Sequence, residues 1–181
     1  MKEEKPYIIG NHLFFLRDGS TITSPSAGDT SRSLAPDRSE TTIVDLGQVG
    51  SLTVTPQVTA REVYAPAQGQ YVLHDVLETM RGLQLSAQLN ELNTFATEHI
   101  WNATKPDGAD EYTPLGRVTM KGWLLIDQYD ELNIKRNEVD LYCYVRFDGA
   151  ITFSDDLVRP TLFAQVLQSS LNKGTLITPS P

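Results

Sequence analysis

The chain has 181 residues, of which 40% are hydrophobic and 8% aromatic, and this composition is typical of a globular protein rather than a disordered one. The 15 Lys and Arg residues and 23 Asp and Glu residues give a formal net charge of −8 with no basic stripe, which argues against tight nucleic-acid binding. The single cysteine, Cys143, excludes an intramolecular disulfide. The length predicts a single domain over residues 1–181. We find no signal peptide or membrane-spanning run, so we expect the chain to be made in the cytoplasm.

The N-terminal part combines a short apolar region with a long polar one. Residues 7–16 predict a strand or a pair of strands that ends in a turn at Asp18-Gly19. The segment from Ser20 to Thr42 is rich in Ser, Thr, Pro, Gly and Asp, and its only aliphatic residues beyond alanine are Ile22 and Leu34. A segment this poor in apolar groups is expected to form no core. We therefore predict a long functional loop over residues 18–42, mobile in the free subunit.

Regular alternation begins after residue 43 and predicts strands. In the run from Ser51 to Thr59, Leu52 and Val54 share one face with Pro56 and Val58, whereas Ser, Thr and Gln occupy the other. Because proline cannot donate a hydrogen bond, Pro56 places this strand at a sheet edge or at a bulge. Residues 62–66 are predicted to be extended, residues 67–70 to turn, and residues 82–89 to alternate again. Residues 71–80 fit either a strand or a helix.

The second half predicts a helix between strands. Residues 92–100 place apolar side chains at helical spacing, and a polar loop follows over residues 102–114. Two long alternating strands are expected over residues 117–127 and 139–147, with a hairpin turn at Asp148-Gly149. A short terminal helix around residues 160–167 and a flexible tail over residues 172–181 complete the chain. The fold class is α+β and mainly β, an antiparallel sandwich or barrel flanked by an α-helix.

The search for chemistry yields no convincing catalytic, cofactor-binding or metal site. The candidates were three histidines, one cysteine and two acidic groups: His12, His74, His99, Cys143, Asp127 with Asp130-Glu131, and Asp155-Asp156. The histidines lack ligand spacing, and His74 and Asp75 point to opposite faces if the segment is a strand. Cys143 lies among apolar residues with no base beside it, as a buried structural cysteine does. The acidic groups fit solvated turns better than a divalent cation site. We therefore expect a structural or binding protein rather than an enzyme.

The order of elements resembles the major tail tube proteins of long-tailed phages, whose fold is shared with secretion tube proteins. The resemblance covers roughly residues 43–171. It rests on the order of the segments along the chain. The run 44–50 leads into the alternating strand, and residues 62–66 with Gly69 follow. The strand over residues 82–89 is followed directly by a helix, and the strands over residues 116–127 and 139–147 come after it. It implies rings of six subunits whose sheets join into one inner barrel. It also implies a long loop that reaches the adjacent ring.

The resemblance predicts a tail tube subunit of a virion, whose rings stack into a channel for DNA passage without specific DNA binding. The partners it implies are copies of the chain itself together with terminator, baseplate or tip, tape measure and sheath proteins. The polar faces of residues 51–59 and 82–90 suit a water-filled channel, and the net acidity suggests a wall that repels DNA. Alternatives are a tail terminator, connector or decoration protein. A small hydrolase or carbohydrate-binding module is a more distant alternative.

Overall fold

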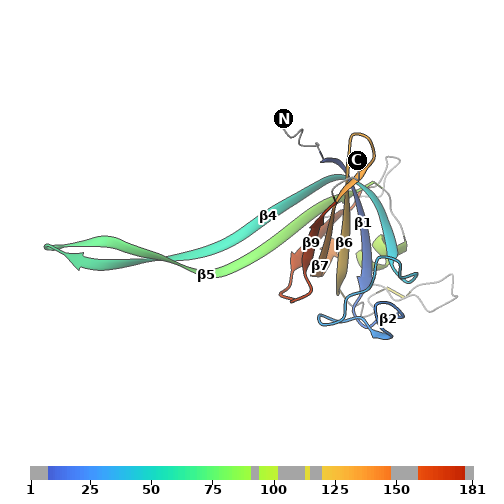
Figure 1. The fold of residues 1–181 in the computed structure, drawn as a ribbon, viewed down its shortest axis with the longest axis horizontal. Coiled ribbons are helices and arrows are strands. Elements are labelled where there is room, and N and C mark those ends of the chain that lie inside the picture. The colour runs from blue at the N-terminus through green and yellow to red at the C-terminus, as the bar shows by residue number, and fades with distance from the viewer. Residues whose placement is uncertain (1–7, 91–93, 102–112, 115–119, 148–158, 178–181) are drawn as a thin grey trace.

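A barrel with one long projecting hairpin forms the structure (Figure 1). The computed structural model describes residues 8–90, 94–101, 113–114, 120–147 and 159–177. The elements in chain order are β1 (Ile8–Arg17), β2 (Thr21–Ile22), β3 (Gly28–Asp29), β4 (Val44–Ala67), β5 (Gln70–Leu89), α1 (Thr94–Ile100), β6 (Lys121–Asp130), β7 (Lys135–Phe147), β8 (Thr161–Val166) and β9 (Lys173–Leu176). The described part is mainly β and antiparallel with one short helix, which confirms the predicted fold class.

Among the described residues, six strands close the barrel in the order β6-β1-β4-β5-β8-β7, because β6 also pairs with β7. Closure removes the exposed edges that an open sheet would present. β9 pairs with the first half of β7, opposite residues 137–140, beyond the part of β7 that pairs with β8. Of the two architectures left open by the sequence, the structure therefore forms the barrel.

The barrel interior is the main hydrophobic core. Its buried side chains come from every barrel strand and from α1, which contributes Phe95 and Ala96. The alternation predicted for residues 139–147 is confirmed, since Leu141, Cys143 and Val145 are buried in this core. Gly122 permits close packing of β6 on β1, because a Cβ atom at this position would lie 2.2 Å from the carbonyl oxygen of Leu16.

β4 and β5 form one hairpin that leaves the barrel (Figure 1). The undecided segment 71–80 is therefore a strand, and the separate runs 43–47, 51–59 and 62–66 belong to one long strand. The turn predicted at residues 67–70 is confirmed, with positive φ angles at Gln68 (45°) and Gly69 (84°). Such angles suit a tight two-residue hairpin turn. Pro56 pairs with Leu83 on an edge strand without a register shift at that point, so the edge alternative holds and the bulge does not.

The segment over residues 18–42 packs against the barrel, which corrects the expectation that it contributes nothing to a core. Its mobility in the free subunit stays a prediction. Ile22 is fully buried within it. Ala35 within the segment and Ile43 directly after it pack against a second apolar cluster on the outer barrel face, built from Trp123, Leu125 and Tyr142. A segment with few apolar residues can pack here, because the outer face of the barrel supplies most of the apolar surface. The predicted role of the segment between rings stays a prediction, and the element that projects from the body is the β4–β5 hairpin.

Two predictions for the C-terminal part are wrong. Residues 161–166 form strand β8 rather than a helix, and residues 173–176 of the supposed flexible tail form strand β9. Leu162 and Ala164 are buried, whereas Gln165 is exposed, because β8 completes the barrel between β5 and β7. Tertiary pairing has overridden the local helical spacing of apolar residues.

The central helix is confirmed as α1 over Thr94–Ile100, and residues 91–93 lie outside the described part. The turn at Asp148-Gly149, the pair Asp155-Asp156 and most of the loop over residues 102–114 lie outside the described residues. Within the described part of the chain, no helix has the length and apolar character needed to cross a membrane.

Candidate assembly surface

The β4–β5 hairpin is the most unusual surface of the molecule, because much of it is a two-stranded ribbon. The strands pair with each other from Val49 opposite Leu89 to Ala67 opposite Gln70. The barrel neighbours stop at the root: β1 pairs with β4 only up to Val49, and β8 pairs with β5 only from Gln84. Among the described residues, both outer edges of the ribbon beyond these positions are unpaired. An isolated two-stranded ribbon is marginally stable in water.

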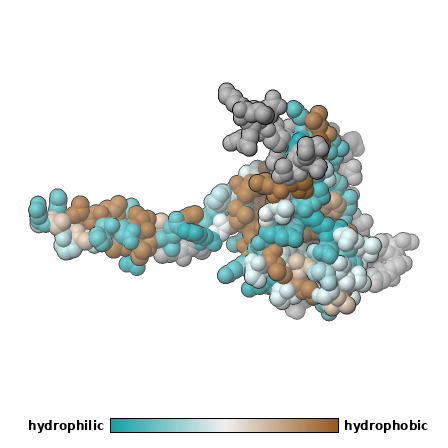
Figure 2. Space-filling view, in the orientation of Figure 1, coloured by the Kyte–Doolittle hydropathy of each residue, from teal (hydrophilic) through white to brown (hydrophobic). Residues whose placement is uncertain are grey.

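One face of this ribbon continues the barrel core outward, and we call it the apolar face. Residues directly opposite each other in an antiparallel pair share a face. Leu85 and Ala87 are core residues, and Leu52 packs against the same core. Following the pairing outward from them, the same face carries the large apolar residues Val54, Pro56, Val58, Tyr64, Tyr71, Leu73, Val76 and Leu83. Midway along the ribbon this face also carries the charged residues Glu62, Glu78 and Arg81. Figure 2 shows apolar surface along the hairpin at a distance from the body. Exposed apolar surface of this extent indicates an interaction site.

The opposite face is polar near the root, and we call it the polar face. It carries the uncharged residues Ser51, Thr53, Thr55, Gln57, Gln84, Ser86 and Gln88. These side chains tolerate water and carry no formal charge, so this part of the face attracts neither cations nor phosphates strongly. The sequence predicted this division between faces correctly. It missed that the alternation continues as one ribbon away from the body.

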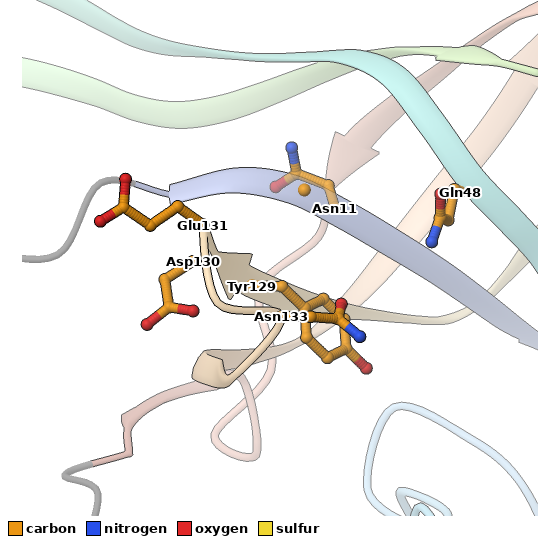
Figure 3. Close-up of a pocket in the computed structure, with 7 residues that line it drawn as sticks. Asn11, Gln48, Tyr129, Asp130, Glu131 and Asn133 are labelled. Atoms are coloured by element: carbon orange, nitrogen blue, oxygen red, sulfur yellow. The ribbon is translucent and has the colours of Figure 1, made fainter.

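A shallow polar hollow of about 220 Å³ lies between the root of the hairpin and the β6–β7 turn (Figure 3). Its lining includes Asn11, Gln48, Tyr129 and Asp130. A row of amides closes the barrel beneath it: Gln128 donates to Asn11 (Nε2 to Oδ1, 2.9 Å), and Asn137 donates to Gln128 (Nδ2 to Oε1, 2.8 Å). These bonds satisfy polar groups at an open barrel end.

The one buried carboxylate that lines the hollow, Asp130, is already hydrogen-bonded within the protein. Asp130 accepts hydrogen bonds from the backbone N–H groups of Leu132 and Ile134, each at 2.9 Å, and from Arg136 Nε at 2.6 Å. Burial raises the pKa of Asp130, but the hydrogen bonds from Ile134, Arg136 and Leu132 outweigh it and lower the pKa below its ordinary value. Asp130 therefore shapes the β6–β7 turn rather than serving as an acid or base.

Arg38 attaches the segment over residues 18–42 to the barrel through an ionic cluster. Its guanidinium pairs with both Asp127 and Asp140, two carboxylates that are buried on the outer face. Lys135 and Lys173 supply second cations at 3.4 Å and 3.3 Å from the same two carboxylates. Buried charges require such partners, because desolvation of an unpaired carboxylate is costly.

Hydrogen bonds to the outer aromatic residues add to this attachment. Trp123 Nε1 donates to the carbonyl of Ser31 at 2.9 Å, and the Tyr142 hydroxyl donates to Asp18 at 2.8 Å. Burial, followed by the hydrogen bond and the charge of Asp18, raises the pKa of Tyr142 to about 12. The phenol is therefore a neutral donor throughout the physiological range, and it fixes the start of the segment.

The structure separates the histidines that the sequence singled out. His12 lies on β1, where its Nε2 is 2.5 Å from Asp45 Oδ1 and its ring stacks on Phe14. His74 lies far out on the hairpin, at a register shift opposite Val63 and Tyr64. The helix α1 includes His99, whose side chain lies outside the described part. The described residues therefore bring no two histidines together.

Cys143 and the acidic residues also take structural positions. The thiol of Cys143 is fully buried, and burial raises its pKa to about 12. A thiol with this pKa is not a nucleophile at neutral pH. Asp127 is held by Arg38 and Lys135, and Asp130 by Arg136. The described part contains no group of three or more His, Cys, Asp or Glu residues arranged to hold a metal ion.

Comparisons with known proteins assign the chain to no family, so its function has to be inferred from the geometry described above. No family model matches the chain, and no curated protein matches it. Among solved structures, the chain is similar to one from a cryo-EM structure of the anti-feeding prophage baseplate, 6-fold symmetrised. The TM-score is 0.36 at 11% identity, and the similarity covers 97% of each chain.

Proposed function

We propose that the chain is a structural subunit of a phage-tail-like particle, which joins copies of itself into rings through the β4–β5 hairpin. The observation that supports the proposal most strongly is the ribbon itself. It has unpaired outer edges among the described residues, and its apolar face is continuous with the barrel core. A sister copy can cover this face and complete these edges, and in doing so it removes the exposed edges that otherwise cause uncontrolled association.

The two faces suggest how such a ring is arranged. The apolar face packs against the neighbouring subunit, and the polar face of the root lines a water-filled channel. The uncharged residues Thr53, Thr55 and Gln57 suit a wall along which DNA moves without binding. The resemblance to tail tube proteins favours rings of six that stack into a tube in the virion. A tail terminator or connector would use the same hairpin in a single ring.

Shortening the hairpin tests the proposal. The variant replaces residues 56–83 with Asn-Gly, a two-residue turn that joins the paired positions Thr55 and Gln84. The barrel is expected to remain folded, because all strand pairing in the body lies outside the removed ribbon. The full chain should form rings or tubes, whereas the shortened variant should stay monomeric, as measured by light scattering and negative-stain microscopy.

Thermal unfolding of the shortened variant is the control for an intact barrel. Assembly of this variant to the same extent as the full chain would contradict the proposal, and so would a full chain that stays monomeric at high concentration. Long tubes would favour a tube subunit, and particles limited to one ring would favour a terminator or connector.

A further inference from the structure

β9 presents a second unfinished sheet edge on the body. It is the last strand of the sheet and pairs with β7 on one side only, within the part of the chain that the structure describes. The N–H of Ile177 donates to the carbonyl of Arg136 at 2.8 Å, which marks this position as a hydrogen-bonded pair. Because such pairs alternate along antiparallel strands, the backbone N–H and C=O groups of Gly174 and Leu176 point away from β7. They are available to another strand.

Exposed apolar side chains lie at the same end of the barrel. Leu176 is 83% exposed and Leu132 is 71% exposed, and Ile134 adds to them from the β6–β7 turn. Leu176 lies opposite Asn137, close to the start of β7, where this turn ends. An open edge flanked by apolar side chains is the type of surface that accepts an added strand, since the backbone supplies affinity and the side chains supply specificity.

Of the two hairpin strands, β5 is suited to fill this edge. β4 contains Pro56 and Pro66 in its projecting part, and neither can donate a backbone hydrogen bond. The projecting part of β5, over residues 70–83, contains no proline. It also carries five of the exposed large apolar residues, namely Tyr71, Val72, Leu73, Val76 and Leu77.

The ribbon is long enough to reach a neighbour. From Ser51 to Ala67 it spans roughly 55 Å at about 3.3 Å per residue. A compact body of this size has a diameter of roughly 40 Å. The hairpin leaves the barrel near the β6–β7 turn, since Val49 lies opposite Asn11 on β1, and β1 begins opposite Asp130.

We infer that the acceptor for the hairpin is the free edge of β9 on a second copy of this chain, to which the projecting part of β5 adds as a further strand. Tyr71, Leu73 and their neighbours then contact the apolar side chains of Leu132, Ile134 and Leu176. The inference rests on the proposed function and adds to it the identity of the receiving surface. Each copy carries one donor and one acceptor, so the contact is head-to-tail and closes into a ring or continues as a filament.

The experiment uses two variants of the full chain, one that lacks the acceptor edge on β9 and one that lacks the donor hairpin. Leu176→Pro removes the outward N–H of β9 but keeps the hydrogen bonds that join this strand to β7, and it leaves the hairpin intact as a donor. The hairpin-shortened variant keeps β9 intact as an acceptor. Each variant alone should be monomeric. A mixture should form a complex of one copy of each with a mass of two subunits, measured by light scattering and native mass spectrometry.

The matched control is Leu176→Val, which keeps the N–H and should assemble like the unmodified chain. Leu176→Lys, which keeps the backbone donor but removes the apolar contact, is a second test and should weaken assembly by at least tenfold. Thermal unfolding of the monomers shows that the barrel is intact.

The outcomes distinguish the inference from the proposed function. If Leu176→Pro assembles like the unmodified chain while the shortened variant does not, the acceptor lies elsewhere and only the inference fails. If Leu176→Pro alone forms symmetric dimers, hairpins pair with one another and the inference also fails. If the shortened variant assembles by itself, the proposed function fails as well.

Discussion

At the scale of single residues, Gly122 shows how a small side chain permits barrel closure. A Cβ atom here would lie 2.2 Å from the Leu16 carbonyl oxygen and 2.7 Å from the ring of Phe15, so backbone would have to move. The position lies within the strand that the sequence predicts over residues 117–127. The close approach of β1 was not recognisable in the sequence, because it depends on pairing between residues more than 100 positions apart.

We expect Gly122→Ala to destabilise the barrel by about 3 kcal/mol, because the new methyl group overlaps backbone atoms of a packed neighbour. This corresponds to a fall in Tm of roughly 6–12 °C for a domain of this size. Thermal unfolding by circular dichroism checks the value. Gly174→Ala is the control, since its nearest contacts of 3.9 Å are ordinary and its stability should change by less than about 0.5 kcal/mol. Equal effects of the two substitutions would contradict this account.

Arg38 is the second residue on which the body depends, because it neutralises Asp127 and Asp140 from the segment over residues 18–42. Arg38→Met keeps an unbranched apolar stem but removes the guanidinium group and its charge. We expect a loss of about 3 kcal/mol, at the lower end for breaking a buried ion pair, because Lys135 and Lys173 remain near the two carboxylates. Urea unfolding measures the loss, and limited proteolysis shows whether the segment is cleaved faster.

Arg32→Met is the matched control within the same segment. Arg32 is exposed and lies over the ring of Tyr142 at 5.8 Å from its centroid, a contact worth about 0.5–1 kcal/mol at an exposed site. If Arg38→Met destabilises the protein no more than Arg32→Met does, the ionic cluster does not hold the segment in place.

At the scale of elements, the hairpin combines two surfaces of different character in one ribbon. The register places Val54 opposite the core residue Leu85 and Thr55 opposite Gln84, so neighbouring residues belong to the apolar and the polar face respectively. In the isolated subunit both Val54 and Thr55 are exposed. Assembly should therefore protect only one of them.

Cysteine substitution at these two positions tests which face packs against a neighbour. We expect Val54→Cys and Thr55→Cys to react at similar rates with a small methanethiosulfonate reagent in the monomer. In assembled particles, Val54→Cys should react at least tenfold more slowly, whereas Thr55→Cys should keep most of its reactivity because its face borders water. The native Cys143 gives little background, since it is fully buried and burial raises its pKa to about 12. If Thr55→Cys were protected and Val54→Cys were not, the polar face would pack against the neighbour and the apolar face would border water, which would contradict the proposed arrangement.

At the scale of the whole molecule, a closed barrel and an open ribbon are joined in one chain. The barrel buries its core without outside help, and the ribbon extends the same sheet into solvent. Closure completes the sheet of the body, whereas among the described residues the outer edges of the ribbon and the outer edge of β9 pair with no strand. In the proposed assembly these edges receive other copies of the chain. This division explains how such a subunit can fold first and assemble afterwards.

The sequence by itself determined what depends on local pattern. Period-2 alternation identified the strands over residues 51–59, 82–89 and 139–147, helical spacing identified α1, and the division of the hairpin into an apolar and a polar face followed from the same alternation. These features depend on residues that are near one another along the chain, so the sequence displays them directly.

Only the tertiary structure decided which strands pair, and the features on which the proposed assembly depends follow from that pairing. The apolar spacing of residues 161–166 fits a helix, yet these residues form β8 because the barrel needs a strand between β5 and β7. The polar segment over residues 18–42 is held by the outer face of β6 and β7, and residues 173–176 become an edge strand through β7. Each outcome is set by contacts between residues distant in sequence, whose pairing energy outweighs local preference.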